Sequence, residues 1–176
     1  LYVADTQNHA VRVIVYNPAI SDIFASPNSC VVHTLNSVNL NFPQNVAVSP
    51  SNDFLYVADY STFRIKKVSL LDGKVTALPG VDVWNLVAPP VMPPVSLVYG
   101  FDIAVSKDGL WLYVADGFNS QVRKVSIQDG TTYRLAGSGQ VGSQDGGAST
   151  ATFYYPAKLA MSDATPWLYV LDANSS

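Results

Sequence analysis

The chain has 176 residues, of which 48% are apolar and only 13% are charged, and its formal net charge is −3. This composition supplies enough apolar side chains for a buried core and excludes an intrinsically disordered chain. The 10 basic residues are outnumbered by 13 acidic ones, so no nucleic-acid partner is expected.

A segment that begins Leu-Tyr-Val-Ala-Asp recurs along the chain and sets its organisation. Copies begin at residues 1, 55 and 112, and a shortened fourth copy with the sequence Leu-Tyr-Val-Leu-Asp begins at residue 168. The intervals between these starting points are 54, 57 and 56 residues. Self-similarity at such a constant period predicts a repeat architecture.

Each copy predicts a β-hairpin. Its first half is short and apolar, its second half mixes β-branched and basic residues, and the segment between them contains turn-forming Thr, Asn, Ser or Gly. An acidic residue ends the first half and a basic residue lies seven positions later, which predicts structural cross-strand ion pairs of opposite charge. The predicted pairs are Asp5 with Arg12, Asp59 with Lys66 and Asp116 with Arg123, and Asp172 is the equivalent acid of the fourth copy.

Two further strands complete each unit. The Asp-Gly pairs at 72–73 and 129–130 predict hairpin turns into a third strand-like run. Another apolar run precedes each Leu-Tyr-Val segment, at residues 45–48, 101–105 and 157–161. The predicted unit is therefore a four-stranded antiparallel meander, and radial repetition of such units gives an all-β fold, the β-propeller.

The apolar runs show little strict alternation of apolar and polar residues. Continuous apolar runs are typical of strands that are covered on both faces, as the blades of a propeller are by their neighbours. A flat β-sandwich, the alternative all-β fold, would show more alternation and no such period.

In these motifs the chain resembles the NHL-repeat family of β-propellers. The shared pattern is a Pro, a short apolar strand, Leu-Tyr-Val-Ala-Asp, an Asn-containing turn, Val-Arg-Lys-Val and a Gly-rich connector, and the connector is fullest at 135–156. The resemblance implies a closed ring, typically of six blades, so this chain is expected to form an incomplete ring as a fragment of a longer propeller. The expected divisions are a partial first blade at 1–42, a second at 43–97, a third at 98–155 and the start of a fourth at 156–176.

Two segments depart from the family pattern, at 16–42 and 81–100, and lack its Gly-rich connector. Loops on a rigid scaffold commonly carry function, and exposed aromatic side chains are good interface anchors. The alternative is that these segments pack over a blade edge as local core. The candidate interaction residues are Trp84, Leu86, Val87, Met92, Ile23 and Phe24. Tyr154 and Tyr155 are further candidates for stacking on a sugar or a peptide, or for filling space between blades.

The recurring acids could be read as a catalytic or calcium-binding ring, but a structural role is the stronger interpretation. An acid that ends a strand can accept hydrogen bonds from nearby backbone N–H groups. A group that is present in every blade supports the blade, whereas a catalytic group usually occurs at one blade only. We therefore predict no catalytic residue among these acids.

Metal and cofactor chemistry finds little support in the residue types. A catalytic zinc site needs three protein ligands, and the only histidines are His9 and His33, so no metal and no cofactor are predicted. Propeller lactonases place acidic and Asn ligands around a central calcium, and a resemblance to them would point to Asn45 and Asp102. Lys158 lies at the comparable place in the fourth unit, so no consistent ligand set emerges.

The predicted function is a non-catalytic protein-interaction scaffold in a larger extracellular or cell-surface protein or assembly, with protein partners, assembly subunits or a glycan. The alternative is a six-bladed propeller hydrolase or lyase whose catalytic residues lie in other blades. Low charge favours the extracellular location, as do the acceptor pattern at Asn174 and a rarer variant of it at Asn28. The chain has no run of about 20 apolar residues that would span a membrane. Its single cysteine, Cys30, excludes an internal disulfide.

Overall fold

The computed structural model describes residues 1–16, 30–35, 40–62, 64–82, 102–162 and 165–173. Apart from two short 3₁₀ turns, η1 (Thr6–Asn8) and η2 (Gly117–Asn119), all regular structure in these residues is β-strand. No helix in the described ranges is long and apolar enough to cross a membrane.

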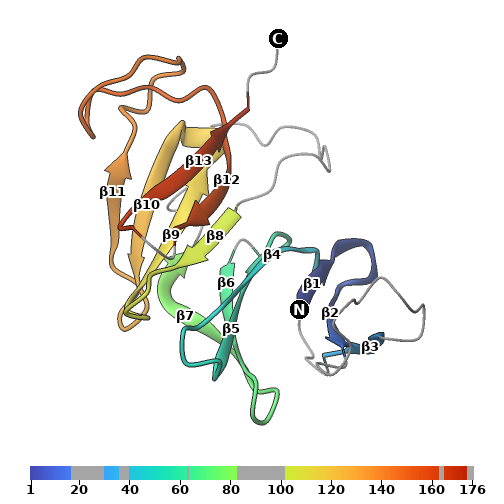
Figure 1. Cartoon of the computed structure of the whole chain (residues 1–176). Coiled ribbons are helices and arrows are strands. Elements are labelled where there is room, and N and C mark those ends of the chain that lie inside the picture. The colour runs from blue at the N-terminus through green and yellow to red at the C-terminus, as the bar shows by residue number, and fades with distance from the viewer. Residues whose placement is uncertain (17–29, 36–39, 63, 83–101, 163–164, 174–176) are drawn as a thin grey trace.

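The strands form four antiparallel sheets that follow one another along the chain (Figure 1). The first blade contains β1 (Tyr2–Asp5), β2 (Ala10–Tyr16) and β3 (Cys30–Thr34). The second contains β4 (Pro43–Val48), β5 (Phe54–Asp59), β6 (Arg64–Ser69) and β7 (Val75–Asp82). The third contains β8 (Asp102–Val105), β9 (Trp111–Asp116), β10 (Gln121–Ser126) and β11 (Thr132–Ala136). The fourth contains β12 (Pro156–Met161) and β13 (Leu168–Asp172).

This arrangement confirms the prediction of an all-β fold built from four-stranded antiparallel blades. Strand order within the second and third blades follows the chain, as expected for a meander. Among the first strands of successive blades, β8 contacts both β4 and β12, so these strands lie at the inner side of the arrangement. The described sheets form part of a ring and do not close one (Figure 1).

One strand was not expected. The segment 16–42, interpreted from the sequence as a loop, contains β3, which pairs with β2 from Arg12 opposite Thr34 to Tyr16 opposite Cys30. The prediction of a loop was wrong for these residues. No Asp-Gly turn marks this hairpin, because its strands are joined by a longer segment.

Apolar side chains fill the space between blades. One cluster joins the second and third blades, and the other joins the first and second. Strand β5 contributes to both: Tyr56 and Ala58 belong to the first cluster, whereas Leu55 and Val57 belong to the second. Both faces of this strand are therefore buried, which explains why its sequence does not alternate between apolar and polar residues.

The turn at η2 fits closely against the residues that lead into the fourth blade. The rings of Phe118 and Tyr155 make an edge contact with centroids 6.1 Å apart, and the Ser120 hydroxyl donates to the Tyr154 carbonyl at 3.3 Å. A Cβ added at Gly117 would lie 2.5 Å from Cζ of Tyr155. Glycine is needed here because the tyrosine ring occupies the space of a side chain.

The substitution Gly117→Ala is expected to lower the free energy of unfolding by about 1–3 kcal/mol, because the added methyl must displace the Tyr155 ring. Urea denaturation would measure the change. Gly147→Ala is the matched control, since its Cβ would meet its nearest atom at an ordinary 3.6 Å. Equal losses in the two variants would contradict this packing.

Candidate functional site

The innermost strands bring three polar residues to the same position in successive blades. Asn45 of β4 faces Ala58, Asp102 of β8 faces Ala115, and Lys158 of β12 faces Leu171. Each therefore faces the residue before the recurring acid of its blade. Register irregularities lie just before two of the three positions, between Pro43 and Asn45 and between Pro156 and Lys158.

Asp102 is the centre of this group. Asp102 is only 4% exposed. Its carboxylate accepts a hydrogen bond from the Asn45 amide and another, 2.6 Å long, from the backbone N–H of Leu159. The ammonium of Lys158 lies 3.6 Å from Oδ1 of Asp102. One buried carboxylate thus connects three blades, so we name Asn45, Asp102, Lys158 and Leu159 the axial cluster.

The axial cluster is a poor site for a cation. The Asp102 carboxylate already has an amide, a backbone donor and a lysine as partners, and a lysine ammonium repels a metal ion. In the described ranges, no group of three or more His, Cys, Asp and Glu side chains is placed to hold a metal. Oδ1 of Asn45 is a buried acceptor with no hydrogen-bond partner.

The two histidines lie apart from this cluster. His9 follows η1 with a left-handed backbone (φ 53°), and its Nδ1 accepts a hydrogen bond from the Phe42 N–H at 3.2 Å. Its ring packs edge-on against Phe42 with centroids 4.4 Å apart. His33 is an exposed residue of β3. His9 therefore makes a contact between the first and second blades.

The first three recurring acids each lie beside the basic residue seven positions later. The ion pairs are Asp5 with Arg12 at 2.9 Å, Asp116 with Arg123 at 2.6 Å, and Asp59 with Lys66. The register, however, differs from the expectation of residues that face each other. Asp5 faces Ala10 and Arg12 faces Val3, so the charged partners are diagonal neighbours across the hairpin. Long Arg and Lys side chains span this diagonal.

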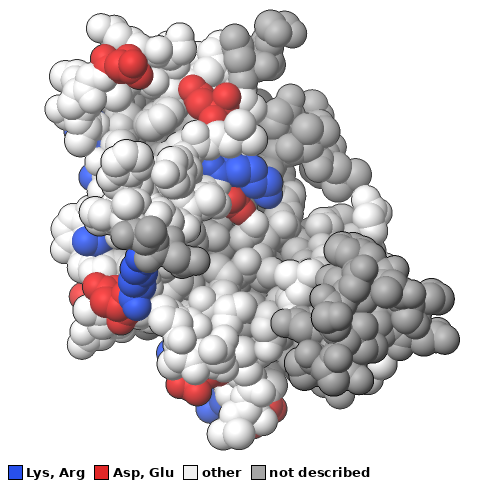
Figure 2. All heavy atoms as spheres, in the orientation of Figure 1, with Lys and Arg blue, Asp and Glu red and all other residues white. Residues whose placement is uncertain are grey.

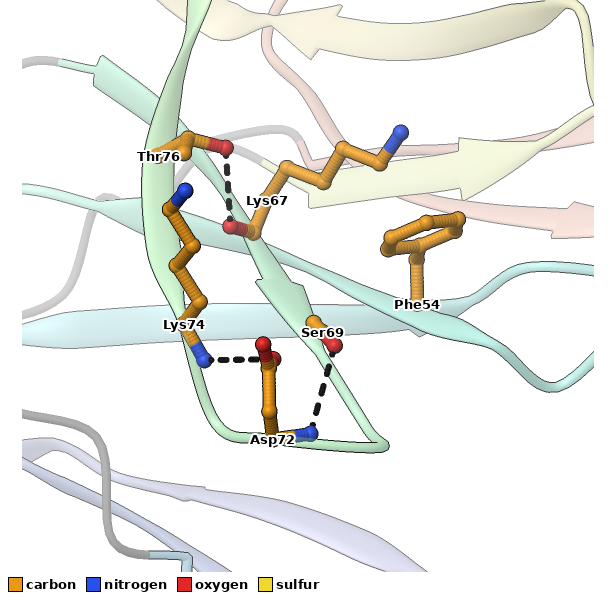
Figure 3. A pocket seen from close by; sticks show the side chains of 6 residues that line it. All are labelled: Phe54, Lys67, Ser69, Asp72, Lys74 and Thr76. Atoms are coloured by element: carbon orange, nitrogen blue, oxygen red, sulfur yellow. Dashed lines mark hydrogen bonds between the residues drawn. The ribbon is translucent and has the colours of Figure 1, made fainter.

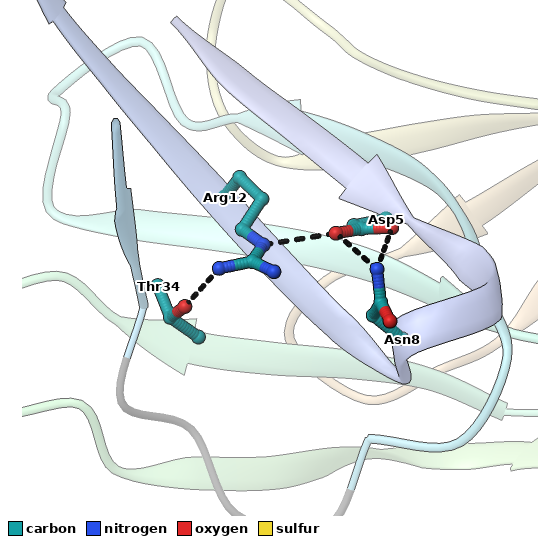
Figure 4. A network of polar contacts seen from close by, with 4 residues as sticks. All are labelled: Asp5, Asn8, Arg12 and Thr34. Atoms are coloured by element: carbon teal, nitrogen blue, oxygen red, sulfur yellow. Dashed lines mark hydrogen bonds and ion pairs between the residues drawn. The ribbon is translucent and has the colours of Figure 1, made fainter. Parts of the chain in front are cut away.

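Figure 4 shows the most exposed example, in the first blade. The Asp5 carboxylate accepts from Nε of Arg12 at 2.9 Å and from the Asn8 amide at 3.0 Å. These hydrogen bonds favour the charged form and lower the pKa of Asp5. In the third blade, burial instead raises the pKa of Asp116, although Asn119 and Arg123 act in the opposite direction.

Sequence reasoning missed a second set of partners for these acids. The Asp59 carboxylate accepts from the Asn41 N–H at 3.1 Å, and the Asp172 carboxylate accepts from the N–H groups of Tyr154 and Tyr155 at 2.8 and 2.6 Å. The donors lie one or two residues before Pro43 or Pro156, the first residues of β4 and β12. Each acid therefore ties the second strand of its blade to the segment that leads into the first strand. The recurrence of Pro43 and Pro156 at equivalent positions of the repeat was the sequence signal from which these contacts could have been predicted.

Two further basic residues, each adjacent to the basic member of an ion pair, lie over aromatic rings. Nζ of Lys67 lies 3.7 Å from the ring centroid of Phe54, and Nζ of Lys124 lies 3.8 Å from that of Trp111. Both are cation–π contacts. On the face drawn in Figure 2, acidic and basic side chains are interspersed and form no continuous basic surface.

Several predicted residues lie outside the described part of the chain. They include the six interaction candidates Trp84, Leu86, Val87, Met92, Ile23 and Phe24, and the glycosylation candidates Asn28 and Asn174. Of the tyrosine pair, Tyr155 packs between blades against Phe118, whereas Tyr154 is 36% exposed. Cys30 begins β3 and is half-buried.

Comparison with known proteins gives matches in sequence and in fold. The model of the NHL repeat matches residues 40–68. Human NHL repeat-containing protein 2 is 27% identical over all of this chain, which spans only 27% of that protein. An auxiliary nutrient binding protein of Bacteroides ovatus has a similar structure, with a TM-score of 0.60 and 18% identity over 95% of this chain and 41% of the other. For a gluconolactonase of Xanthomonas campestris the TM-score is 0.51, with 17% identity over 93% of this chain and 50% of the other.

The two structural likenesses show the fold alone, since their sequence identities are low. The chain spans about a quarter of the length of the curated relatives named NHL repeat-containing protein 2. The repeat match, these relatives and the four-stranded blades agree with one another. These findings support the NHL-repeat family: the chain contains an NHL repeat at residues 40–68 and is similar over its whole length to NHL repeat-containing protein 2.

Proposed function

We propose that this chain is part of a non-catalytic propeller that binds protein partners or assembly subunits. The observation that carries the proposal is that the buried or recurring carboxylates are engaged in hydrogen bonds within and between blades. The carboxylates of Asp59, Asp116 and Asp172 each accept hydrogen bonds that hold their own blade together. The Asp102 carboxylate holds three blades together. Groups engaged in this way support a rigid scaffold.

The proposed contacts are made by the segments that differ from the repeat. Residues 83–94 contain Trp84, Leu86, Val87 and Met92, which are large apolar side chains of the kind that anchor interfaces. Ile23 and Phe24 in the first blade are the second proposed contact. Two Pro-Pro pairs in 83–94 favour an extended conformation, which lowers the entropy cost of binding.

Deletion of residues 83–94 tests this role. The variant is expected to keep the thermal unfolding midpoint of the parent chain and to lose capture of the partner that the parent chain retains from an extract of its source. The matched control deletes 143–147 from the Gly-rich connector of the third blade, whose residues are exposed. Unchanged folding together with unchanged capture would remove 83–94 as the contact segment.

We also propose an extracellular or cell-surface location, which the low content of charged residues and the acceptor pattern at Asn174 support. Treatment of the natural protein with a peptide N-glycosidase is then expected to lower its mass. A mass that does not change after treatment, together with recovery of the protein from the cytosol, would contradict the location.

A second candidate function is hydrolysis by a propeller enzyme, with further catalytic residues in other blades. The specific observation in its favour is the axial cluster, which gathers an amide, a carboxylate and an ammonium on innermost strands. The fold likeness to a gluconolactonase is compatible with it. The test is whether the natural protein hydrolyses a lactone and whether Asp102→Asn abolishes this hydrolysis without changing stability. Both results together would establish hydrolysis as the function and exclude the non-catalytic scaffold.

A further inference from the structure

A small pocket opens on the second blade, and no residue of the axial cluster lines it (Figure 3). Its volume is about 190 Å³, and its lining comes from β5, β6, β7 and the turn between β6 and β7. The lining residues are Phe54, Lys67, Ser69, Asp72, Lys74 and Thr76. We name this site the lysine pocket. Sites for drug-sized ligands have volumes of about 300–1,000 Å³, so its volume suits a single side chain better.

The strands hold this lining in place. Phe54 faces Ser69 across β5 and β6, and Lys67 faces Thr76 across β6 and β7. The Lys67 ammonium lies over the Phe54 ring at 3.7 Å from its centroid. A cation held over a ring face keeps N–H donors available for an anion while its position is restricted.

The acid of the pocket is already engaged in the turn. The Asp72 carboxylate accepts from the Lys74 backbone N–H at 3.1 Å, and hydrogen bonding to Ser69 lowers the pKa of Asp72. Within the described residues, neither Lys67 nor Lys74 forms an ion pair, in contrast to Lys66 of the same strand. In Figure 3 the Lys67 side chain extends from β6 toward the Phe54 ring, whereas the Lys74 side chain extends from the turn along β7 toward Thr76. The pocket therefore has an excess of positive charge.

The third blade contains the same arrangement with one informative difference. Lys124 lies over Trp111, and Asp129 accepts from the Thr131 N–H at 3.0 Å as Asp72 does from Lys74. In the third blade, Thr131 occupies the position equivalent to Lys74. Tyr133 occupies the position equivalent to Thr76, and its ring contacts that of Trp111. The lysine over an aromatic ring belongs to the repeat, but the second lysine belongs to the second blade.

We propose that the lysine pocket binds a carboxylate side chain from an acidic segment of a partner protein. The proposal rests on the proposed function of the chain as a protein-binding propeller. The Lys67 ammonium would donate to the carboxylate, the charge of Lys74 would attract it, and the aliphatic part of the bound side chain would contact Phe54. A charge-assisted hydrogen bond from an ammonium to a carboxylate is stronger than a neutral one.

Titration of the full chain with a fluorescein-labelled octaglutamate peptide, followed by fluorescence anisotropy at low salt, tests the proposal. Lys74→Thr, which gives the second blade the residue of the third, is expected to weaken binding about twofold to fivefold. Lys67→Gln should have a similar effect. The reciprocal Thr131→Lys should strengthen binding, because it adds the second lysine to the third blade. Arg134→Gln, a change at an exposed residue of β11, is the control and should change nothing.

Equal octaglutamate affinity in the parent chain, Lys74→Thr and Lys67→Gln would overturn the proposal, and so would the absence of binding. Tighter binding of a heparin fragment, weakened by the same two variants, would assign the pocket to a sulfated glycan and overturn the protein partner. Deletion of 83–94 could abolish partner capture while Lys74→Thr leaves it unchanged. That result would overturn the lysine pocket as a binding site, whereas the proposed function would stand. Conversely, Lys74→Thr could abolish octaglutamate binding while deletion of 83–94 leaves partner capture unchanged. That result would support the lysine pocket and overturn 83–94 as the contact segment.

Discussion

Replacing Asp59 by Ala is expected to lower the free energy of unfolding by about 3–5 kcal/mol. The Asp59 side chain is fully buried, and its ion-pair partner Lys66 has a side chain only 10% exposed. Without the carboxylate, the Lys66 ammonium and the Asn41 N–H lose an acceptor in a site with little access to water. Breaking one side of a buried ion pair is costly because the remaining charge is uncompensated. Urea denaturation at neutral pH measures the loss.

The repeat supplies a matched control at Asp5. Its side chain is 26% exposed and that of its partner Arg12 is 37% exposed, so Asp5→Ala should cost much less than Asp59→Ala. If Asp59→Ala does not fold, the double variant Asp59→Ala with Lys66→Met should recover part of the stability, because no unpaired charge remains. Equal losses at the two acids, or no recovery in the double variant, would contradict a buried ion pair.

Replacing Leu112 by Ala is expected to lower the free energy of unfolding by about 2–5 kcal/mol. Leu112 is 0% exposed and belongs to the cluster that joins the second and third blades. Truncation removes apolar contacts and leaves a cavity that the rigid sheets on either side cannot readily fill. The same denaturation experiment measures this effect.

Leu110 is the control for this substitution, since it lies two residues earlier and is 59% exposed. Leu110→Ala should change stability by less than about 0.5 kcal/mol. A loss at Leu112 no larger than the loss at Leu110 would show that the second and third blades do not pack as described.

The blades could be predicted from the sequence because their signals are local. The recurring Leu-Tyr-Val segments contain residues that favour strands, and the Asp-Gly pairs at 72–73 and 129–130 specify tight turns that the structure contains, with glycine φ angles of 72° and 74°. The continuous apolar runs indicated burial on both faces, and strand β5 shows it. Each of these inferences needs only residues that are near one another along the chain.

Contacts between distant residues could not be predicted in the same way. Asn45 and Asp102 are 57 residues apart, and so are Asp102 and Leu159, so only the stacking of successive blades brings them together. The position of the lysines over aromatic rings depends on which face of the sheet each side chain occupies. Strand β3 was missed because no short turn precedes it. The diagonal placement of Asp5 and Arg12 was missed because spacing in a hairpin does not reveal how many residues the turn contains.

Photo-crosslinking from position 84 tests the proposed binding role most directly. The photoreactive residue p-benzoylphenylalanine in place of Trp84 is expected to give one discrete covalent product with a partner protein when the chain is irradiated in an extract of its source. The control carries the same residue in place of Val141, which is 65% exposed in the Gly-rich connector of the third blade and lies outside both proposed contact sites. A product from position 84 that is absent from position 141 is the predicted result. No product from position 84, or the same products from both positions, would contradict a protein-binding scaffold that uses this segment.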